Sequence, residues 1–355
     1  MTGQDVTVTI STRNRYYSTL PLCLVAIANQ TITPKKIILF DDGEHKDLRE
    51  DNLYKNIFTL FNEKKISWEV VFGTGEGQVR NHQFALENKP NSQEPVVSTE
   101  LIWRLDDDNI PEPNVLETLL SSFSDSTGAV ACLVLNSKHG VVKNSLASNK
   151  IEDIFLGMNE QWFLFENNET KKVDHLYSTF LFRKKAAFHG YCKELSRVGH
   201  REETIFTYEM TRNNWDCLIN PNAIVWHFNF ESGGIRDNTN EDMWRHDENI
   251  FHQKMENWNI KPNDYFFAVL DCGIGDHFSF KTILPEIIEK NKNKKIVLSV
   301  CFEDVFYDYQ EIKLISIADA KLMFGDIDKW NVYKWLIDHN WKGSLVDAFK
   351  NIYLK

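Results

Sequence analysis

Apolar residues in the first 110 positions form short runs, of which the first, at residues 6–11, alternates with threonine, and longer segments with a helical pattern separate them. The short runs, rich in branched and aromatic residues, predict strands at residues 6–11, 36–40, 67–72 and 101–105. Helical patterns lie between them at residues 20–30, 53–63 and 78–88. Because strands alternate with helices, the pattern predicts a mainly parallel α/β sheet with right-handed crossovers.

The remaining pattern predicts two domains. Further strands are expected at residues 129–135, 175–183 and 221–228, with helices at 114–123 and 202–213. Residues 229–240 are rich in Gly, Asn, Asp and Ser, which is typical of a loop. Pro262 marks a boundary, after which strands at 265–271 and 296–300 flank a helix at 277–291. We expect one domain at residues 1–260 and a small, Rossmann-like α/β domain at residues 261–355.

The composition narrows the class of protein. Of 355 residues, 42% are hydrophobic and 26% charged, as in an ordinary globular chain, and a formal charge of −11 disfavours nucleic acid as a partner. The six cysteines are scattered, without metal or redox spacing. With neither a signal peptide nor an apolar run long enough to span a bilayer, we expect a cytoplasmic chain, with peripheral membrane attachment left open.

Polar clusters follow three of the predicted strands. Ligands bind beyond the carboxyl ends of strands in sheets of this kind, so a shared edge favours a binding site. Each cluster taken alone also fits ordinary turn chemistry. The clusters are Thr12, Arg13, Asn14 and Arg15 after the first strand, Asp41 and Asp42 after the second, and Asp106, Asp107 and Asp108 after the fourth.

Two carboxylates separated by one residue suggest a metal site. Asp106 and Asp108 have the spacing to hold a hard divalent cation, Mn²⁺ or Mg²⁺. His227 follows the apolar run at 223–226 and is the candidate third ligand, because imidazole binds Mn²⁺ acceptably. The alternative for a lone histidine in this context is a packed or surface residue.

Two further motifs carry charge at predicted helix starts. Only one of the adjacent Glu202 and Glu203 can face a cleft, where a carboxylate can accept a proton, and the alternative is a favourable interaction with the helix dipole. Arg80 opens the helix after a glycine-rich turn, where a guanidinium can bind a diphosphate. The alternative for Arg80 is a surface salt bridge.

The order of the motifs STRNR, FDDG, GQVRN, LDDDN, REET and VWH, over about residues 6–245, resembles the family-2 glycosyltransferases of the GT-A fold. Ser11 stands where that family usually has proline, and Glu203 where it often has aspartate. The resemblance implies donor contacts for Thr12, Arg13, Asp41, Asp42, Arg80, Asp106 and Asp107. It implies metal ligation by Asp108, Asp106 and His227, and catalysis by Glu203 within the Glu202–Glu203 pair.

The implied reaction is metal-dependent transfer of a sugar, with inversion, from a UDP-linked nucleotide sugar to a hydroxyl of a surface polysaccharide or lipid-linked glycan. The glycine-containing loop at residues 232–236 is expected to close over the diphosphate and bring Arg236 to it. The resemblance implies an acceptor wall in the segment that contains Trp162, His175 and Tyr177, and a packed core role is the alternative for Trp162.

The end of the chain carries a second resemblance. The segment DCGIGDHFSFKTILPEI resembles the first strand, loop and helix of heptosyltransferase-like GT-B enzymes, which implies an accessory α/β module.

Two other functions are alternatives to this reading of the chain. One is a glycosyltransferase acting on modified DNA bases, which the charge of −11 opposes unless a local basic patch exists. The other is a non-catalytic sugar- or nucleotide-binding scaffold, which the intact acids at 106, 108 and 203 oppose. Self-association stays open.

Overall fold

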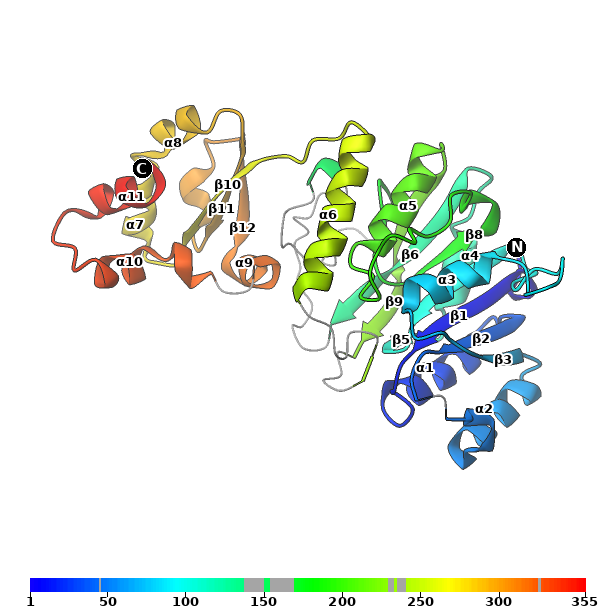
Figure 1. Ribbon diagram of the computed structural model, residues 1–355. Helices are drawn as coiled ribbons and strands as arrows, with labels where there is room; N and C mark the ends of the chain where they lie inside the picture. Colours follow the sequence, from blue (N-terminus) through cyan, green and yellow to red (C-terminus); the bar gives the residue numbers. More distant parts are fainter. Residues whose placement is uncertain (45, 137–149, 154–168, 229–232, 235–240, 325–326) are drawn as a thin grey trace. The chain divides into compact units, whose positions relative to one another are not determined.

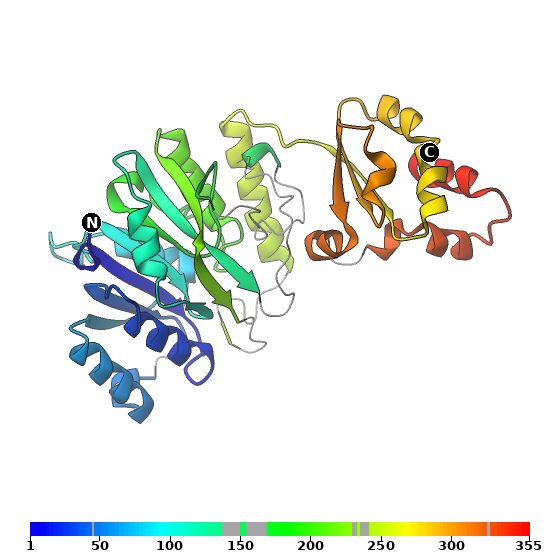
Figure 2. The same ribbon diagram turned by 180° about the vertical axis from the view of Figure 1, so that it is seen from behind.

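The computed structural model describes residues 1–44, 46–136, 150–153, 169–228, 233–234, 241–324 and 327–355 (Figure 1; Figure 2 gives the reverse view). The described chain divides into two compact units. Residues up to Ile260 belong to the larger unit, apart from Glu152 and Asp153, and those from Lys261 to the smaller. A boundary between two folding domains at residues 260 and 261 stays a prediction.

The larger unit is built on a nine-stranded sheet with the order β3-β2-β1-β4-β8-β6-β9-β5, in which β7 also pairs with β9. The strands β1 to β4, β6 and β9 share one direction, and β5, β7 and β8 run against it. This confirms the predicted α/β class with a mainly parallel sheet. The strands are β1 (Val6–Thr12), β2 (Lys36–Asp41), β3 (Ser67–Phe72), β4 (Leu101–Asp106), β5 (Asn109–Pro111), β6 (Thr127–Asn136), β7 (Lys171–Val173), β8 (Phe180–Arg183) and β9 (Asp216–His227).

Helices cover both faces of this sheet. On one face the main apolar core joins the sheet to three helices, for example through Leu20, Phe58 and Leu119. On the other, Phe84 meets Phe40 edge to face and Phe206 meets Phe182 in the same way. The helices are α1 (Thr19–Ala28), α2 (Asn52–Glu63) and α4 (Val115–Ser121) on the first face, α3 (Gln78–Leu86) and α5 (Glu202–Arg212) on the second, and α6 (Glu241–Asn257) beyond α5 (Figure 1).

Strand register places polar residues from distant parts of the chain at one edge. In the parallel ladder Thr12 pairs with Asp41, and Ser11 pairs with Asp106, so β1, β2 and β4 end at nearly the same level. The chain then turns through Asp107 and Asp108 into β5, which pairs antiparallel with β9. In this pairing Asn109 lies opposite His227. The topology therefore brings the end of β9 beside the acids that follow β4.

Two predicted elements differ from the structure. The strand predicted at 175–183 begins only at Phe180, because Ser178 adopts a left-handed backbone conformation with φ of 57°. The single helix predicted at 277–291 is divided into α7 (Ile274–Lys281) and α8 (Leu284–Lys290), and Pro285 stands in the first turn of α8. Proline lacks an N–H and its ring clashes with the preceding turn, which explains the break.

The smaller unit is a separate α/β layer. Its parallel sheet has the order β10 (Tyr265–Leu270), β11 (Lys295–Val300) and β12 (Ile312–Ser316). Two apolar clusters form its core, one of them around Leu298 and Phe349 and the other around Val297 and Ile315. Three more helices follow the sheet, α9 (Ile317–Phe324), α10 (Val332–Asp338) and α11 (Leu345–Tyr353). A small α/β unit at this end is confirmed, and its likeness to a heptosyltransferase module stays a prediction.

Across the ranges that the structure describes, no helix has both the length and the apolar composition that crossing a bilayer requires.

Candidate functional site

The acids after β4 are held by groups from the end of β1. The hydroxyl of Thr12 donates a hydrogen bond of 2.6 Å to Asp107 Oδ2. One guanidinium nitrogen of Arg15 lies 2.9 Å from Asp107 Oδ1 and 2.5 Å from Asp108 Oδ2. Both acids are buried, so Arg15 compensates negative charge that the interior would otherwise penalise. The predicted convergence of the β1 and β4 ends is thus present in the structure.

His227 meets the same group of acids. Its Nε2 atom lies 3.2 Å from Asp108 Oδ2. Burial alone would raise the pKa of Asp108, but the hydrogen bond and charge of His227, with Arg15 beside them, hold it below its usual range. Burial lowers the pKa of His227, and the opposing influence of Asp108 outweighs this and raises it. The two side chains therefore favour one another's charged forms.

The side chains at this edge are in part suited to a divalent ion. No group of three His, Cys, Asp or Glu side chains in the described ranges is arranged as a metal site. Asp106 is turned away, because its Oδ2 accepts 3.0 Å from Ser178 Oγ and its Oδ1 lies 3.4 Å from Arg104. However, Asp108 Oδ2 and His227 Nε2 lie 3.2 Å apart, close enough to share a cation that replaces the Arg15 contact and the imidazole proton, since neighbouring ligands on one ion lie roughly 3 Å apart. Magnesium-type ions are commonly held by one or two carboxylates, with substrate phosphates completing the shell.

The acids after β2 have structural partners of their own. Asp41 accepts from Tyr16 Oη at 2.8 Å and from the backbone N–H of Gly43 at 2.9 Å. Asp42 accepts from the backbone N–H groups of Gly75 and Gly77, at 3.0 and 2.8 Å. Asp42 therefore fixes the glycine turn that precedes α3, so that turn and the end of β2 form one wall.

The predicted arginines have different surroundings. Arg13 donates 2.8 Å to the backbone carbonyl of Asp42, which joins the β1 and β2 ends. Arg80 is exposed and pairs with Glu76 at 3.1 Å, one turn away on the surface. In the predicted glycine loop, Gly234 donates 2.7 Å to the Arg13 carbonyl, so its described part lies against the end of β1. Arg236 lies outside the described residues.

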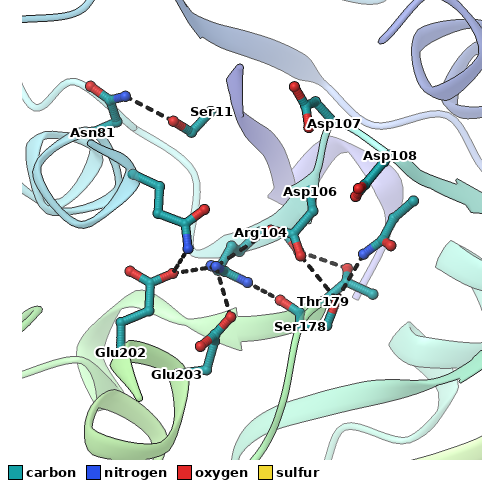
Figure 3. A network of polar contacts seen from close by, with 12 residues as sticks. Ser11, Asn81, Arg104, Asp106, Asp107, Asp108, Ser178, Thr179, Glu202 and Glu203 are labelled. Atoms are coloured by element: carbon teal, nitrogen blue, oxygen red, sulfur yellow. Dashed lines mark hydrogen bonds and ion pairs between the residues drawn. The ribbon is translucent and has the colours of Figure 1, made fainter. Parts of the chain in front are cut away.

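The acidic pair at the start of α5 surrounds a buried arginine (Figure 3). Arg104, in the middle of β4, is fully buried and its Nη2 hydrogen bonds to Glu202 Oε1 and, at 3.1 Å, to Glu203 Oε1. Glu202 is fully buried, whereas 13% of the Glu203 side chain is exposed. Burial raises the pKa of Glu202 to about 8 against the opposing charge of Arg104. Of the two acids, only Glu203 reaches solvent.

Helix α6 anchors the loop that leads into α5. Asp247, fully buried, accepts from the backbone N–H groups of Ser196 and His200, at 2.6 and 2.8 Å. Glu248 lies 3.0 Å from both His200 Nε2 and Arg201 Nε. Arg201 has a left-handed φ of 68° directly before Glu202, so these contacts fix the point at which α5 begins.

The predicted acceptor residues are only partly described. His175 is buried and Tyr177 is half-buried, both just before β8. The backbone N–H of Leu176, between them, donates 2.8 Å to Thr207 Oγ1, so this segment is tied to α5. Trp162 lies outside the described residues.

Two residues of the site were not predicted from the sequence. Arg104 pairs with the predicted acids of α5, and Asp247 holds the loop before α5. For Arg104 the signal was present, because an arginine inside the apolar run LIWRL must be paired if the strand is buried. For Asp247 no local signal exists, because its partners are backbone groups some 50 residues earlier.

Comparison with known proteins gave a family match. The family described as Glycosyl transferase family 2 matches residues 7–191, or 185 of the 355 residues. A search of curated proteins gave no match. Among solved structures, GalNAc-T7 with UDP, GalNAc and Mn²⁺ is 16% identical, with a TM-score of 0.46, and the match covers 63% of this chain and 43% of that one.

Two further structures give similar values. TarS 1–349 of S. aureus is 14% identical with a TM-score of 0.43, covering 64% of this chain and 60% of that one. The mannosyltransferase PcManGT from Pyrobaculum calidifontis, in complex with GDP-Man and Mn²⁺, is 14% identical with a TM-score of 0.42, covering 64% and 57%. The chain thus matches less than two thirds of each of these proteins. At these TM-scores the likenesses carry no weight beyond the family match.

Proposed function

The chain belongs to glycosyl transferase family 2, and on this premise we propose that it is a metal-dependent, inverting transferase that moves a sugar from a UDP-linked donor to a hydroxyl acceptor. Its α/β fold is the GT-A type that the family resemblance implied. The observation that carries the proposal is the approach of His227 to Asp108 at the edge where β1, β2 and β4 end. Separate strands supply this pair, since Asp108 follows β4 and His227 ends β9.

The donor is proposed to bind along this edge. Asp108 and His227 would hold Mn²⁺ or Mg²⁺, whose charge would stabilise the departing diphosphate. Asp106 would join them as a ligand only by leaving Ser178 and Arg104. The β1 and β2 ends form the nucleotide wall, and the arginines supply positive charge to the phosphates. The proposed donor contacts are Thr12, Arg13, Asp41, Asp42, Arg80, Asp106, Asp107 and Arg236.

Glu203 is proposed as the general base. Its carboxylate is partly exposed and lies 3.1 Å from the Arg104 guanidinium, so it is available in ionised form to accept the proton of an acceptor hydroxyl. As the proton leaves, the acceptor oxygen attacks the anomeric carbon, and the bond from that carbon to the diphosphate oxygen breaks. Attack from the face opposite the leaving group inverts the configuration.

The acceptor is proposed to be a growing surface polysaccharide or a lipid-linked glycan. The segment tied to α5 by Leu176 lies next to the helix that carries Glu203, which supports an acceptor wall formed with His175, Tyr177 and Trp162. The unit from Lys261 onward is proposed as an accessory domain that resembles part of a heptosyltransferase and docks the acceptor or a second protein.

A donor screen tests this function. The release of nucleoside diphosphate is measured with Mn²⁺ and with EDTA, for the wild type, for Glu203→Gln and for the control Glu209→Gln on the same helix. We expect one donor to react with Mn²⁺ only. Loss of a general base lowers kcat by about 10²–10⁴-fold in Glu203→Gln, and the control keeps the wild-type rate. Release that is indifferent to EDTA, or full activity of Glu203→Gln, contradicts the proposal.

A further inference from the structure

Arg104 is a charged residue in the interior of a strand that is otherwise apolar. It occupies the middle of β4, between Trp103 and Leu105, and all three side chains are fully buried. A buried guanidinium is tolerated only where carboxylates or carbonyls satisfy its charge and its N–H groups. The partners of Arg104 therefore indicate what this costly residue holds in place.

The guanidinium of Arg104 joins three separate elements (Figure 3). Its Nη1 donates to the carbonyl of Ser178, before β8, and its Nη2 donates to Glu202 Oε1 and Glu203 Oε1 on α5. The same Nη2 lies 3.4 Å from Asp106 Oδ1, at the end of its own strand. The rigid fork of one arginine thus fixes the distance between the strand-end acids and the two glutamates of α5.

Glu202 is held from a second side. Its Oε1 also accepts 2.8 Å from Gln78 Nε2, the first residue of α3. Gly77, directly before Gln78, donates its N–H to Asp42, so this contact leads back to the end of β2. With its side chain fully buried and Oε1 committed to Arg104 and Gln78, Glu202 has no access to an acceptor.

We propose that Arg104 and Glu202 are positioning residues that hold Glu203 at the point where it receives the acceptor proton. Glu202 anchors the guanidinium, and the guanidinium orients the Glu203 carboxylate relative to the strand-end acids. The inference rests on the proposed role of Glu203 as base. It assigns Glu202 a function that involves no proton transfer with substrate.

The test separates positioning from an ordinary structural ion pair. Arg104→Lys keeps the positive charge but loses the fork, so the Glu203 carboxylate shifts. Misplacement by about 1 Å costs on the order of 100-fold, and we expect kcat to fall by about 10–100-fold with the donor KM changed by less than about twofold. Glu202→Ala, which removes the oxygen that accepts from Arg104 and Gln78, is expected to lower kcat in the same range.

Arg183→Lys is the matched control. Arg183 is also a buried arginine, paired with Glu100 and with the carbonyls of Thr127 and Ser124. It lies opposite Leu101, at the start of β4 and away from Asp106. This control measures the effect of replacing a buried guanidinium elsewhere in the same sheet. The kcat of Arg183→Lys is expected to stay within about twofold of the wild type.

The decisive measurement repeats Arg104→Lys in the Glu203→Gln background. If Arg104 acts through Glu203, adding Arg104→Lys to Glu203→Gln changes the residual kcat by less than about twofold. The reason is that the effects of substituting residues that act as one unit are not additive. An equal loss in both backgrounds overturns the inference in favour of a structural role. So does a kcat for Arg104→Lys equal to that of Arg183→Lys. If the wild type itself releases no nucleoside diphosphate from any donor, the proposed function fails and this inference fails with it.

Discussion

His227 Nε2 lies 3.2 Å from Asp108 Oδ2, although 119 positions separate the two residues in the chain. The contact follows from the short antiparallel pairing of β5 with β9, in which Asn109 lies opposite His227. It is reinforced by the backbone N–H of Phe228, which donates 2.9 Å to the carbonyl of Asp108. The backbone pairing therefore places His227 directly beside Asp108.

Replacing His227 should weaken metal use without abolishing it. In His227→Ala one of the two fitted ligands is lost and Asp108 remains. We expect the Mn²⁺ concentration for half-maximal diphosphate release to rise by about 10–100-fold, a range seen when groups that support a metal are removed. The measurement is a Mn²⁺ titration of the rate. The control His189→Ala removes an exposed histidine and should leave the curve unchanged. An unchanged curve for His227→Ala would count against its role as a ligand.

The sequence predicted this edge of the sheet well because local physics determines it. Strands β1, β2 and β4 carry apolar or branched residues and end abruptly in polar ones, and the strand predicted at 67–72 matches β3 (Ser67–Phe72) at both ends. Alternation with helices then implies parallel pairing, which brings the strand ends together. The placement of Thr12, Asp41 and Asp106 at one edge of the sheet follows from this alternation alone.

The sequence did not predict the parts that depend on distant contacts. Helix α6 was missed because its apolar residues are sparse, and buried Asp247 serves backbone groups of another segment. The late start of β8 reflects the left-handed Ser178, whose carbonyl accepts from Arg104. Such contacts leave no periodic signal in a chain, so only the three-dimensional structure reveals them.

Two glycines of the turn before α3 offer a matched pair. Both have positive φ, 79° for Gly75 and 96° for Gly77. A Cβ at Gly75 would meet nothing within 4 Å, whereas one at Gly77 would lie 2.4 Å from the carbonyl oxygen of Arg197. We expect Gly75→Ala to cost about 1–2 kcal/mol of unfolding free energy, from backbone strain alone.

Gly77→Ala adds a backbone clash to the same strain. Its cost should exceed that of Gly75→Ala by about 1–3 kcal/mol, the usual penalty for overpacking. Urea unfolding of both variants, followed by circular dichroism, provides the comparison. Equal stability of the two variants would show that the turn does not pack on the 197 segment as described.

The contacts of Glu248 in α6 with His200 and Arg201, just before α5, predict a pH dependence of stability. Burial would raise the pKa of Glu248, but the hydrogen bond of His200 and the charge and hydrogen bond of Arg201 lower it from 4.5 to about 2. His252 also faces this carboxylate, at 3.6 Å. A lowered pKa means that the stabilising contribution is complete above about pH 5 and is lost as the pH falls toward 2.

Glu248→Gln removes that contribution. The wild type should exceed Glu248→Gln in unfolding free energy by about 1–3 kcal/mol at pH 6, and the difference should shrink steadily between pH 5 and pH 2. Denaturant unfolding over this pH range measures it. The control Glu256→Gln, an exposed position on the same helix, should match the wild type throughout. A difference that is constant with pH would exclude the ion pair as its source.

A divalent ion held by Asp108 for a nucleotide ligand underlies the proposed function, and calorimetric titration with UDP measures it. The wild type, Asp108→Asn and the half-buried control Asp47→Asn are each titrated with Mn²⁺ and with EDTA. The wild type and the control are expected to bind UDP with Mn²⁺ and to lose at least about tenfold in affinity with EDTA. Asp108→Asn is expected to bind weakly in both conditions, a loss of about 1.4 kcal/mol or more. Equal binding of UDP by all three proteins, with and without the metal, would overturn the proposed function.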